Sequence, residues 1–156
     1  MAKAVWFDKD IDSKIDKASK RIIKAGCIAL SNDLKDMMGG SNAGQHLPYR
    51  SKKNPTQTHW SSKPGSAPNI DTGALKDSIS WDTSFGASGG ARRGLNEGVK
   101  SPGGGRFVKT GAVGTNHPGA KALEFGYSPN NLAPRPFMTV AYEFFKLNDF
   151  LRKFRL

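Results

Sequence analysis

The feature that most constrains this chain is a long amphipathic pattern near its N-terminal end. Across residues 8–38, apolar or small residues recur at alternating steps of four and three, at Ile11, Ile15, Ala18, Ile22, Ala25 and Ala29. This spacing has the period of an α-helix, and the stripe is widened by Ile23, Leu30, Leu34 and Met37. We expect Asp8 or Asp10 to cap the start of the helix and the Gly39-Gly40 pair to end it. At ~1.5 Å of rise per residue, such a helix is a rod of roughly 40 Å.

The rod is long for a chain of 156 residues. We interpret it as a helix that covers the core, with Gly26 and Cys27 at packing positions near its middle. A helix of this length could also reach a neighbouring molecule. Its charges are nearly balanced, with seven basic and six acidic residues over 8–38, so the surplus of positive charge lies elsewhere in the chain.

Two long segments lack an apolar period, and we expect them to be extended loops of a single domain that spans 1–156. Residues 39–70 are rich in Gly, Ser, Pro and Asn, and residues 86–105 contain eight glycines. Loops of this length in a compact domain are usually functional or disordered. The basic residues that could face a partner or DNA from these loops and their borders are Arg50, Lys52, Lys53, Lys63, Arg92, Arg93, Lys100 and Arg106.

The segments between these loops predict a small sheet. Apolar and polar residues alternate over 79–85, which predicts a strand with one buried face. Residues 106–115 predict a second strand that pairs with the first as a long hairpin. Before the first strand, Asp71 or Thr72 is expected to cap a short helix.

The last third of the chain predicts two more helices. A short helix over 119–125 is expected to end at Gly126, and Pro136 suits the first position of the final helix. The apolar stripe of that final helix, expected to be core in its first half, is Phe137, Val140, Phe144, Leu147, Leu151 and Phe154. The fold class predicted from all segments is α+β, with a small, mostly antiparallel sheet packed by a long N-terminal helix, a short helix and a C-terminal helix.

The net charge of the chain limits the classes of partner that we expect it to bind. The chain has 24 Lys and Arg residues against 13 Asp and Glu residues, for a net charge of +11. A positive field on loops favours nucleic acid, an acidic protein face or a membrane surface. Aromatic residues among the basic ones, such as Tyr49, Trp60 and Phe107, could stack on unpaired bases. Non-specific contact with DNA and contact with an acidic protein are about equally supported at this point.

The residue pattern offers no candidate for catalysis. Cys27 is the only cysteine, and His46, His59 and His117 are scattered without a second metal ligand three or four residues away. The glycine-rich stretches lack the Lys-Ser/Thr ending of a phosphate-binding loop. We therefore expect no catalytic, cofactor or metal site. The first ten residues do not resemble a signal peptide, and no apolar run is long enough to span a membrane, so we expect a protein made in the cytoplasm.

Three short motifs, taken together, resemble one family. The first runs over 62–68 as Ser-Lys-Pro-Gly-Ser-Ala-Pro and continues over 71–79 with Asp-Thr-Gly-Ala-Leu and Ser-Ile. The second is Ala-Leu-Glu-Phe-Gly over 122–126, and the third is Ala-Pro-Arg-Pro-Phe over 133–137. In this order, after a long N-terminal helix, they resemble the neck or tail-completion (head–tail joining) proteins of long-tailed bacteriophages. The residues that carry the resemblance are Asp71, Thr72, Gly73, Leu75, Ser78, Ile79, Glu124, Phe125, Gly126, Arg135, Pro136 and Phe137.

The resemblance covers about half of the chain, over 62–81 and 119–145, and implies a structural role without cofactor or reaction. It implies a homo-oligomeric ring, commonly of six copies, in the virion neck. Such a ring joins the connector and head-completion proteins of the DNA-filled head to the tail tube or the tail terminator protein. Two features depart from the family pattern: the long basic segment 39–70 and the extra Pro134. A tail terminator or minor tail protein, and a non-specific nucleic-acid-binding protein, remain the alternatives.

Physical reasons can be given for several motif residues. Gly73 permits a close approach or an unusual backbone angle. Glu124 is expected to lie beside a buried aromatic residue, Phe125. Arg135 is held between two prolines, so its side chain is well aimed. From this we predict that Glu124 and Arg135 form an ion pair, either within one chain or across a ring interface.

Overall fold

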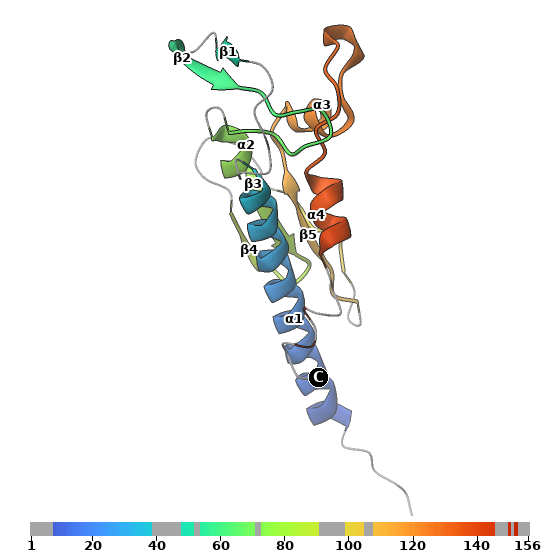
Figure 1. The fold of residues 1–156 in the computed structure, drawn as a ribbon. Helices are drawn as coiled ribbons and strands as arrows, with labels where there is room; N and C mark the ends of the chain where they lie inside the picture. The colour runs from blue at the N-terminus through green and yellow to red at the C-terminus, as the bar shows by residue number, and fades with distance from the viewer. Residues whose placement is uncertain are drawn as a thin grey trace, which may run out of the picture.

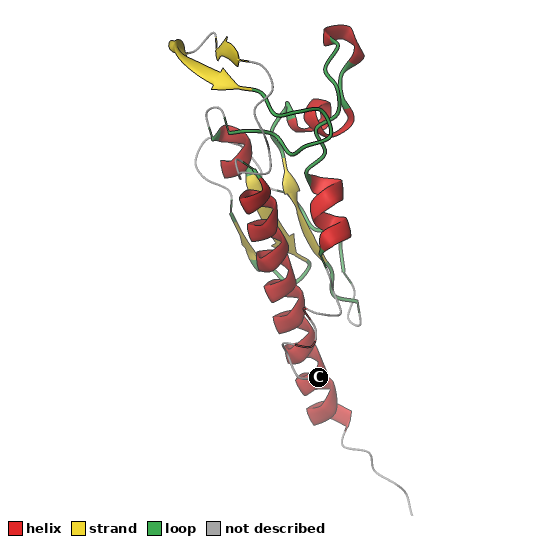
Figure 2. Cartoon of the chain, viewed as in Figure 1, coloured by secondary structure: helices red, strands yellow, loops and turns green. Residues whose placement is uncertain are grey.

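The computed structural model has the predicted α+β architecture, with a long helix laid along a small antiparallel sheet (Figures 1 and 2). The chain is described here over residues 8–38, 48–51, 54–70, 73–90, 99–104 and 108–145, with residues 150 and 152. Predictions for Asp71, Thr72, Lys52, Lys53, Arg92, Arg93 and Arg106 lie outside these residues. None of the described helices is long and apolar enough to cross a membrane.

Helix α1 spans Asp8–Met37, so the predicted long helix is confirmed. At ~1.5 Å per residue it is a rod of about 45 Å, and its first turns extend beyond the end of the sheet (Figure 1). Asp10 was expected as a possible cap, but it lies inside the first turn because the helix begins at Asp8. There a carboxylate still interacts favourably with the positive end of the helix dipole.

The face of α1 that packs on the core contains the residues that widen the predicted stripe, such as Leu34, and not the part of the stripe that begins at Ile11. The buried positions are Cys27, Ser31, Leu34 and Met38. At 3.6 residues per turn these lie roughly opposite the stripe that begins at Ile11 and continues to Ala29. The first two residues of that stripe, Ile11 and Ile15, are 49% and 59% exposed. Leu34 confirms the wider part of the predicted stripe, whereas Ser31 on the same face was not part of it because serine is polar.

The middle of α1 is covered on a second side by the C-terminal segment. A Cβ atom placed on Gly26 would lie 3.6 Å from the ring of Phe150, and that ring lies 5.7 Å from the ring of Phe145. Gly26 is therefore a packing position, as predicted, because the ring of Phe150 lies next to it. Cys27, 7% exposed, is likewise a packing residue.

The main sheet has the strand order β4-β3-β5, with β3 (Ile79–Thr83) in the centre. Its neighbours are β4 (Ser88–Gly89) and β5 (Gly111–Thr115), both antiparallel to β3. The predicted pairing of the two longer strands is confirmed, with Ile79 opposite Thr115 and Thr83 opposite Gly111. They do not form one long hairpin, because the chain first pairs as β4 on the far side of β3.

Both faces of β3 are covered, whereas the alternating pattern predicted a single buried face. Ile79 and Thr83 are buried, and Ser80 on the opposite face is only 2% exposed. The cause is the segment after β4, which folds back over the sheet. There the backbone N–H of Val99 donates to Ser80 Oγ at 3.0 Å, and that of Ser101 donates to Asp82 Oδ2 at 2.8 Å. The polar residues of the strand thus hold a covering segment.

A second hairpin lies within the segment that was predicted to be a structureless loop. Strands β1 (Pro48–Ser51) and β2 (Asn54–Trp60) pair antiparallel, with Tyr49 opposite His59. The prediction was wrong because β2 has no apolar face. Its strand-forming residues are threonines and one tryptophan, and both Thr56 and Trp60 are exposed.

Two short helices flank the sheet. Helix α2 spans Ala74–Asp77, and its N-cap is Gly73 with a φ of 78° and no capping side chain, which replaces the predicted cap at Asp71 or Thr72. Helix α3 spans Ala120–Phe125 and ends at Gly126, as predicted. A single 3-10 turn, η2 (Ser128–Asn130), follows.

Helix α4 spans Met138–Phe144, so the helix begins two residues after Pro136 and not at it. Its predicted stripe holds only at first. Phe137 is completely buried and Val140 is half-buried, but Phe144 is 73% exposed. Ala141, 2% exposed, takes its place against the core. The buried core cluster comes from α1, β3, α3 and α4 and the residues next to them, and it consists of Leu34, Met38, Ile79, Ala120, Phe137 and Ala141.

Candidate functional site

The three motifs that carry the family resemblance meet in space at the C-terminal end of α1. The backbone N–H of Gly65 donates to the carbonyl of Pro134 at 2.8 Å. Arg135 links all three segments: its Nε donates to the carbonyl of Ser62 at 3.1 Å, and its backbone N–H donates to the carbonyl of Leu123 at 2.6 Å. Segments up to 73 residues apart in the chain are thus joined directly by hydrogen bonds.

Glu124 fastens α3 to the start of α4. One carboxylate oxygen accepts from the backbone N–H groups of Phe137 and Met138, at 2.9 and 3.0 Å. The other accepts from the backbone N–H and the hydroxyl of Thr139, at 2.9 and 2.5 Å. The first N–H groups of a helix have no partner within it, and here a side chain from a different helix supplies one. Glu124 is only 6% exposed, so its charge is held inside the domain by these four donors.

The protonation of Glu124 reflects this arrangement. Burial alone raises the pKa of its carboxyl, but the hydrogen bonds from the Thr139 hydroxyl and the three backbone N–H groups outweigh burial. They hold the pKa below its ordinary value of 4.5. The hydrogen bonds favour the charged form because an ionised carboxylate accepts more strongly than a neutral one.

Two expectations about this region were wrong. Glu124 does not pair with Arg135 within the chain, because both of its oxygens are occupied and Arg135 donates to the carbonyls of Ser62 and Ala133. Phe125 is not the buried partner of Glu124: the aromatic ring is 70% exposed and the carboxylate is buried. A pair of Glu124 and Arg135 across a ring interface stays a prediction.

The other motif residues serve the same junction. Ser78 is 4% exposed, and its Oγ is hydrogen-bonded to the carbonyl of Leu75 at 2.6 Å and to Thr115 Oγ1. It therefore links α2 to β5. Ile79 is fully buried in the core. Gly126 has a φ of 79° and a ψ of 171°, a conformation open in practice only to glycine.

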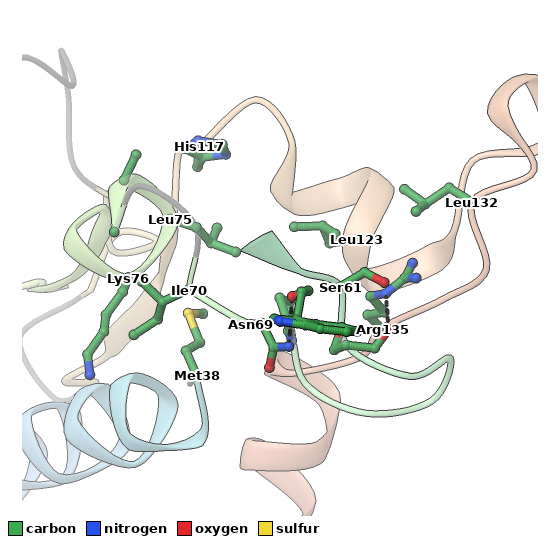
Figure 3. A pocket seen from close by; sticks show the side chains of 15 residues that line it. Met38, Ser61, Asn69, Ile70, Leu75, Lys76, His117, Leu123, Leu132 and Arg135 are labelled. Carbon is green, nitrogen blue, oxygen red and sulfur yellow. Dashed lines mark hydrogen bonds between the residues drawn. The ribbon is translucent and has the colours of Figure 1, made fainter. Parts of the chain in front are cut away.

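A pocket of about 370 Å³ opens beside this junction (Figure 3). In that view, Met38, Ile70 and Leu75 lie on one side and Leu123, Leu132 and Arg135 lie on the other. Trp60 also lines the pocket. Trp60 and Ile70 are 42% and 45% exposed. The volume is near the lower end of the ~300–1,000 Å³ typical of ligand pockets.

The pocket also has polar lining residues, among them Ser61, Ser62 and Asn69. Lys76, His117 and Arg135 contribute to its lining, and no acidic residue is among the described lining residues. Ser62 also lines it, and Ser62 Oγ is a buried side-chain atom without a hydrogen-bond partner. Leaving such a group unsatisfied costs about 1–3 kcal/mol.

Few of the predicted basic loop residues can be placed. Lys63 and Lys100 are exposed, and Arg50 contributes its backbone to β1. The structure does not bring Lys63 and Lys100 into the pocket. Lys109, in contrast, lies against α1, where its Nζ is 3.2 Å from the carboxylate of Asp16. Among the described residues, no group of three or more His, Cys, Asp or Glu side chains is arranged to hold a metal ion.

Two features were not predicted from the sequence: the hydrogen bonds that Thr139 donates to Glu124, and the pocket around Ser62. A threonine two residues after a Pro-Phe pair is a weak signal, because its function depends on a carboxylate that comes from another helix. Comparisons with protein-family models, with curated proteins and with solved structures find no match to this chain.

Proposed function

We propose that this protein is a structural component of a bacteriophage neck, where copies of the chain form a ring that joins the DNA-filled head to the tail. The supporting observation is the convergence of the three motif segments. Residues 62–65, 122–126 and 133–137 form one hydrogen-bonded junction, with Arg135 and Glu124 at its centre. Residues that resemble one family in sequence therefore also act as one structural unit, which is expected if they share a common origin.

Exposed apolar side chains on the surface support a role in binding other proteins. Large apolar side chains stand exposed on several elements: Phe125, Tyr142 and Phe144 are each at least 70% exposed. Single exposed apolar residues are ordinary, but aromatic residues at this exposure are enriched at interfaces. The rod of α1 adds exposed isoleucines at its projecting end.

The decisive experiment removes the gene and examines the lysate by electron microscopy. DNA-filled heads and free tails of normal length should accumulate side by side, with few infectious particles, because head filling and tail polymerisation use other proteins. Unfilled heads would instead assign the protein to packaging or head closure, and overlong tails would make it a tail terminator. Normal virions would refute the proposal.

The nucleic-acid-binding alternative has its own test. Binding through Lys and Arg contacts to phosphates loses affinity steeply with salt. If the isolated chain binds DNA with a steep salt dependence and forms no ring at any concentration, the non-specific nucleic-acid-binding function takes precedence over the structural one.

A further inference from the structure

We propose that residues 126–134 form a preorganised recognition loop that inserts into an uncharged groove of a protein other than this chain. The inference deepens the proposed function and rests on it, because under that function the groove belongs to a head or tail protein beside the ring. It thus names the kind of contact by which the ring would bind its neighbour.

The 126–134 loop leaves the domain and returns to the point where it left. At its base, the backbone N–H of Arg135 donates to the carbonyl of Leu123 at 2.6 Å, and Glu124 binds the N–H groups at the start of α4. Beyond this base the loop projects away from the sheet, with η2 at its tip (Figures 1 and 2). Because the two ends of the loop meet, the excursion is not needed to connect α3 with α4. Compact surface loops whose ends lie close together are frequently functional.

Hydrogen bonds within the loop fix its shape. Tyr127 and Leu132 exchange two backbone hydrogen bonds, at 2.8 and 3.1 Å. Nearer the tip, the N–H of Asn131 donates to the carbonyl of Ser128 at 3.0 Å. Asn131 has a φ of 48° and is the only non-glycine residue with a positive φ in the described part of the chain. Residues 127–131 are all exposed, so this defined shape is kept where the core gains nothing from it.

A loop that already has its bound shape loses little conformational entropy when it binds a partner. The residues that carry the family resemblance produce this shape. Glu124 and Gly126 lie at one end of the loop, and Arg135 lies at the other. A Cβ atom on Gly126 would stand 2.8 Å from the carbonyl oxygen of Leu132, so the two legs of the loop approach closely because residue 126 is glycine. The motif residues thus hold the base, and the residues between them are presented to a partner.

The composition of the loop indicates a protein partner. No residue from 126 to 134 carries a charge, whereas 24% of the residues in the chain do. Contact with nucleic acid depends on Lys and Arg, which neutralise phosphates, and the loop has neither. Its Tyr, Ser and Asn residues are the types that antibody loops use to bind proteins. Tyr127 is 48% exposed, and Phe125 at the base of the loop is 70% exposed.

An uncharged loop is complemented by an uncharged groove, because a charge buried against it would lose water and gain no opposite charge. Two pockets found among the described residues of this chain do not meet that condition. Lys76 and Arg135 line the first. The second, of about 390 Å³, lies along the N-terminal half of α1 and is lined by Asp16, Lys20 and Lys109 among others. We therefore assign the groove to a different protein.

The first experiment places a photo-crosslinking residue on the loop. The full chain with Tyr127→p-benzoylphenylalanine is made in the cell that produces this protein, irradiated, and its crosslinked products are identified by mass spectrometry. We expect one protein that differs from this chain. Tyr142, 74% exposed on α4, gives the matched control Tyr142→p-benzoylphenylalanine, which should not capture that protein. Crosslinks from residue 127 only to a second copy of this chain, only to DNA, or to nothing overturn the proposal.

The partner identified in this way is then purified and titrated with the full chain. Tyr127→Ser should weaken binding about 30-fold, as for an aromatic anchor of an interface, and Tyr142→Ser should leave the affinity within about threefold. The urea midpoint of both variants should match that of the unaltered chain. Asn130→Lys and Asn130→Asp should each weaken binding, because either charge enters an uncharged groove. If one of these two variants binds more tightly, the groove is charged and the proposal is wrong.

The identity of the partner separates this inference from the function on which it rests. A head or tail protein supports both. If the partner belongs to neither structure and gene deletion leaves normal virions, the loop contact stands and the neck function fails. If deletion yields separate heads and tails, and purified Tyr127→Ser chain joins them as well as the unaltered chain does, the neck function stands and the loop contact is wrong.

Discussion

The two ends of α1 differ sharply in what surrounds them. At the C-terminal end, Leu34 and Met38 are 2% and 3% exposed and lie in the core with Phe137. At the N-terminal end, Ile11 and Ile15 are about half exposed, and Asp16 forms ion pairs with Lys20 and Lys109. The same helix thus serves as a core element at one end and as a projecting rod at the other.

This difference separates the residues that stabilise the domain from those available for assembly. Glu124, Arg135 and Ser78 of the motifs lie at the packed end, where their hydrogen bonds are made within the chain. At the projecting end, about half of the surface of Ile11 and Ile15 is exposed. Substitutions at the packed end should therefore lower the free energy of unfolding, and substitutions at the projecting end should leave it unchanged.

Leu34→Ala should have the largest effect. The side chain is 2% exposed within the core cluster, so its loss removes apolar contacts and leaves a cavity. We expect the free energy of unfolding to fall by about 3–4 kcal/mol. Urea denaturation of the monomer measures this. A loss below about 1 kcal/mol would mean that the C-terminal end of α1 is not packed as described.

Glu124→Ala should come next, with a loss of about 2–4 kcal/mol, because it leaves the first N–H groups of α4 without their acceptor. Thr139→Val is a matched probe, since it removes only the hydroxyl donor of the same cluster. It should cost less than Glu124→Ala. If the two variants were equally stable, the carboxylate would not be the cap of α4.

Gly126→Ala should cost about 2–3 kcal/mol, because φ is 79° there and the backbone must stay in that region. The added Cβ would also stand 2.8 Å from the carbonyl oxygen of Leu132. Gly103→Ala is the control, since nothing lies within 4 Å of its Cβ and its φ is not in the positive region. The control should change stability by less than about 0.5 kcal/mol.

Lowering the pH should reduce the free energy of unfolding, because Glu124 at the packed end becomes protonated. Its pKa in the folded chain is lowered, so its contribution is complete above the unfolded pKa of ~4.3 and is lost as pH falls through the lower folded pKa. We expect the unaltered chain to be more stable than Glu124→Gln at pH 5.5 and the difference to shrink as pH approaches 2.5. Asp16 also has a lowered pKa, but it is present in both proteins and its effect cancels. If the difference in the free energy of unfolding between the two proteins stays constant with pH, the charge of Glu124 does not contribute to stability.

The two ends also differ in how well sequence predicts them. Local patterns predicted α1, the two strands β3 and β5 and the end of α3 at Gly126, because each depends on residues close in the chain. The predictions that were wrong concern residues whose structure depends on partners far away in the chain. The start of α4 shifts from Pro136 to Met138, where Glu124 supplies the cap, and Ser80 is buried because Val99 folds over it. The pocket draws on residues from Met38 to Arg135, which no local pattern connects.

The smallest effect on stability is expected at the projecting end itself. Ile15 is 59% exposed, so Ile15→Ser removes little buried surface and should change the free energy of unfolding by less than about 0.5 kcal/mol. Its effect should appear in assembly instead, because an exposed apolar residue gains contacts only when a second molecule covers it. Sedimentation of Ile15→Ser at a concentration where the unaltered chain assembles should show a shift toward monomer, while its urea midpoint stays the same. Ile28, 38% exposed on the same helix, allows the matched variant Ile28→Ser, which should shift assembly less because that residue lies toward the packed end. Should Ile15→Ser lower the urea midpoint as Leu34→Ala does, the projecting end would be part of the core and the contrast between the two ends would be lost.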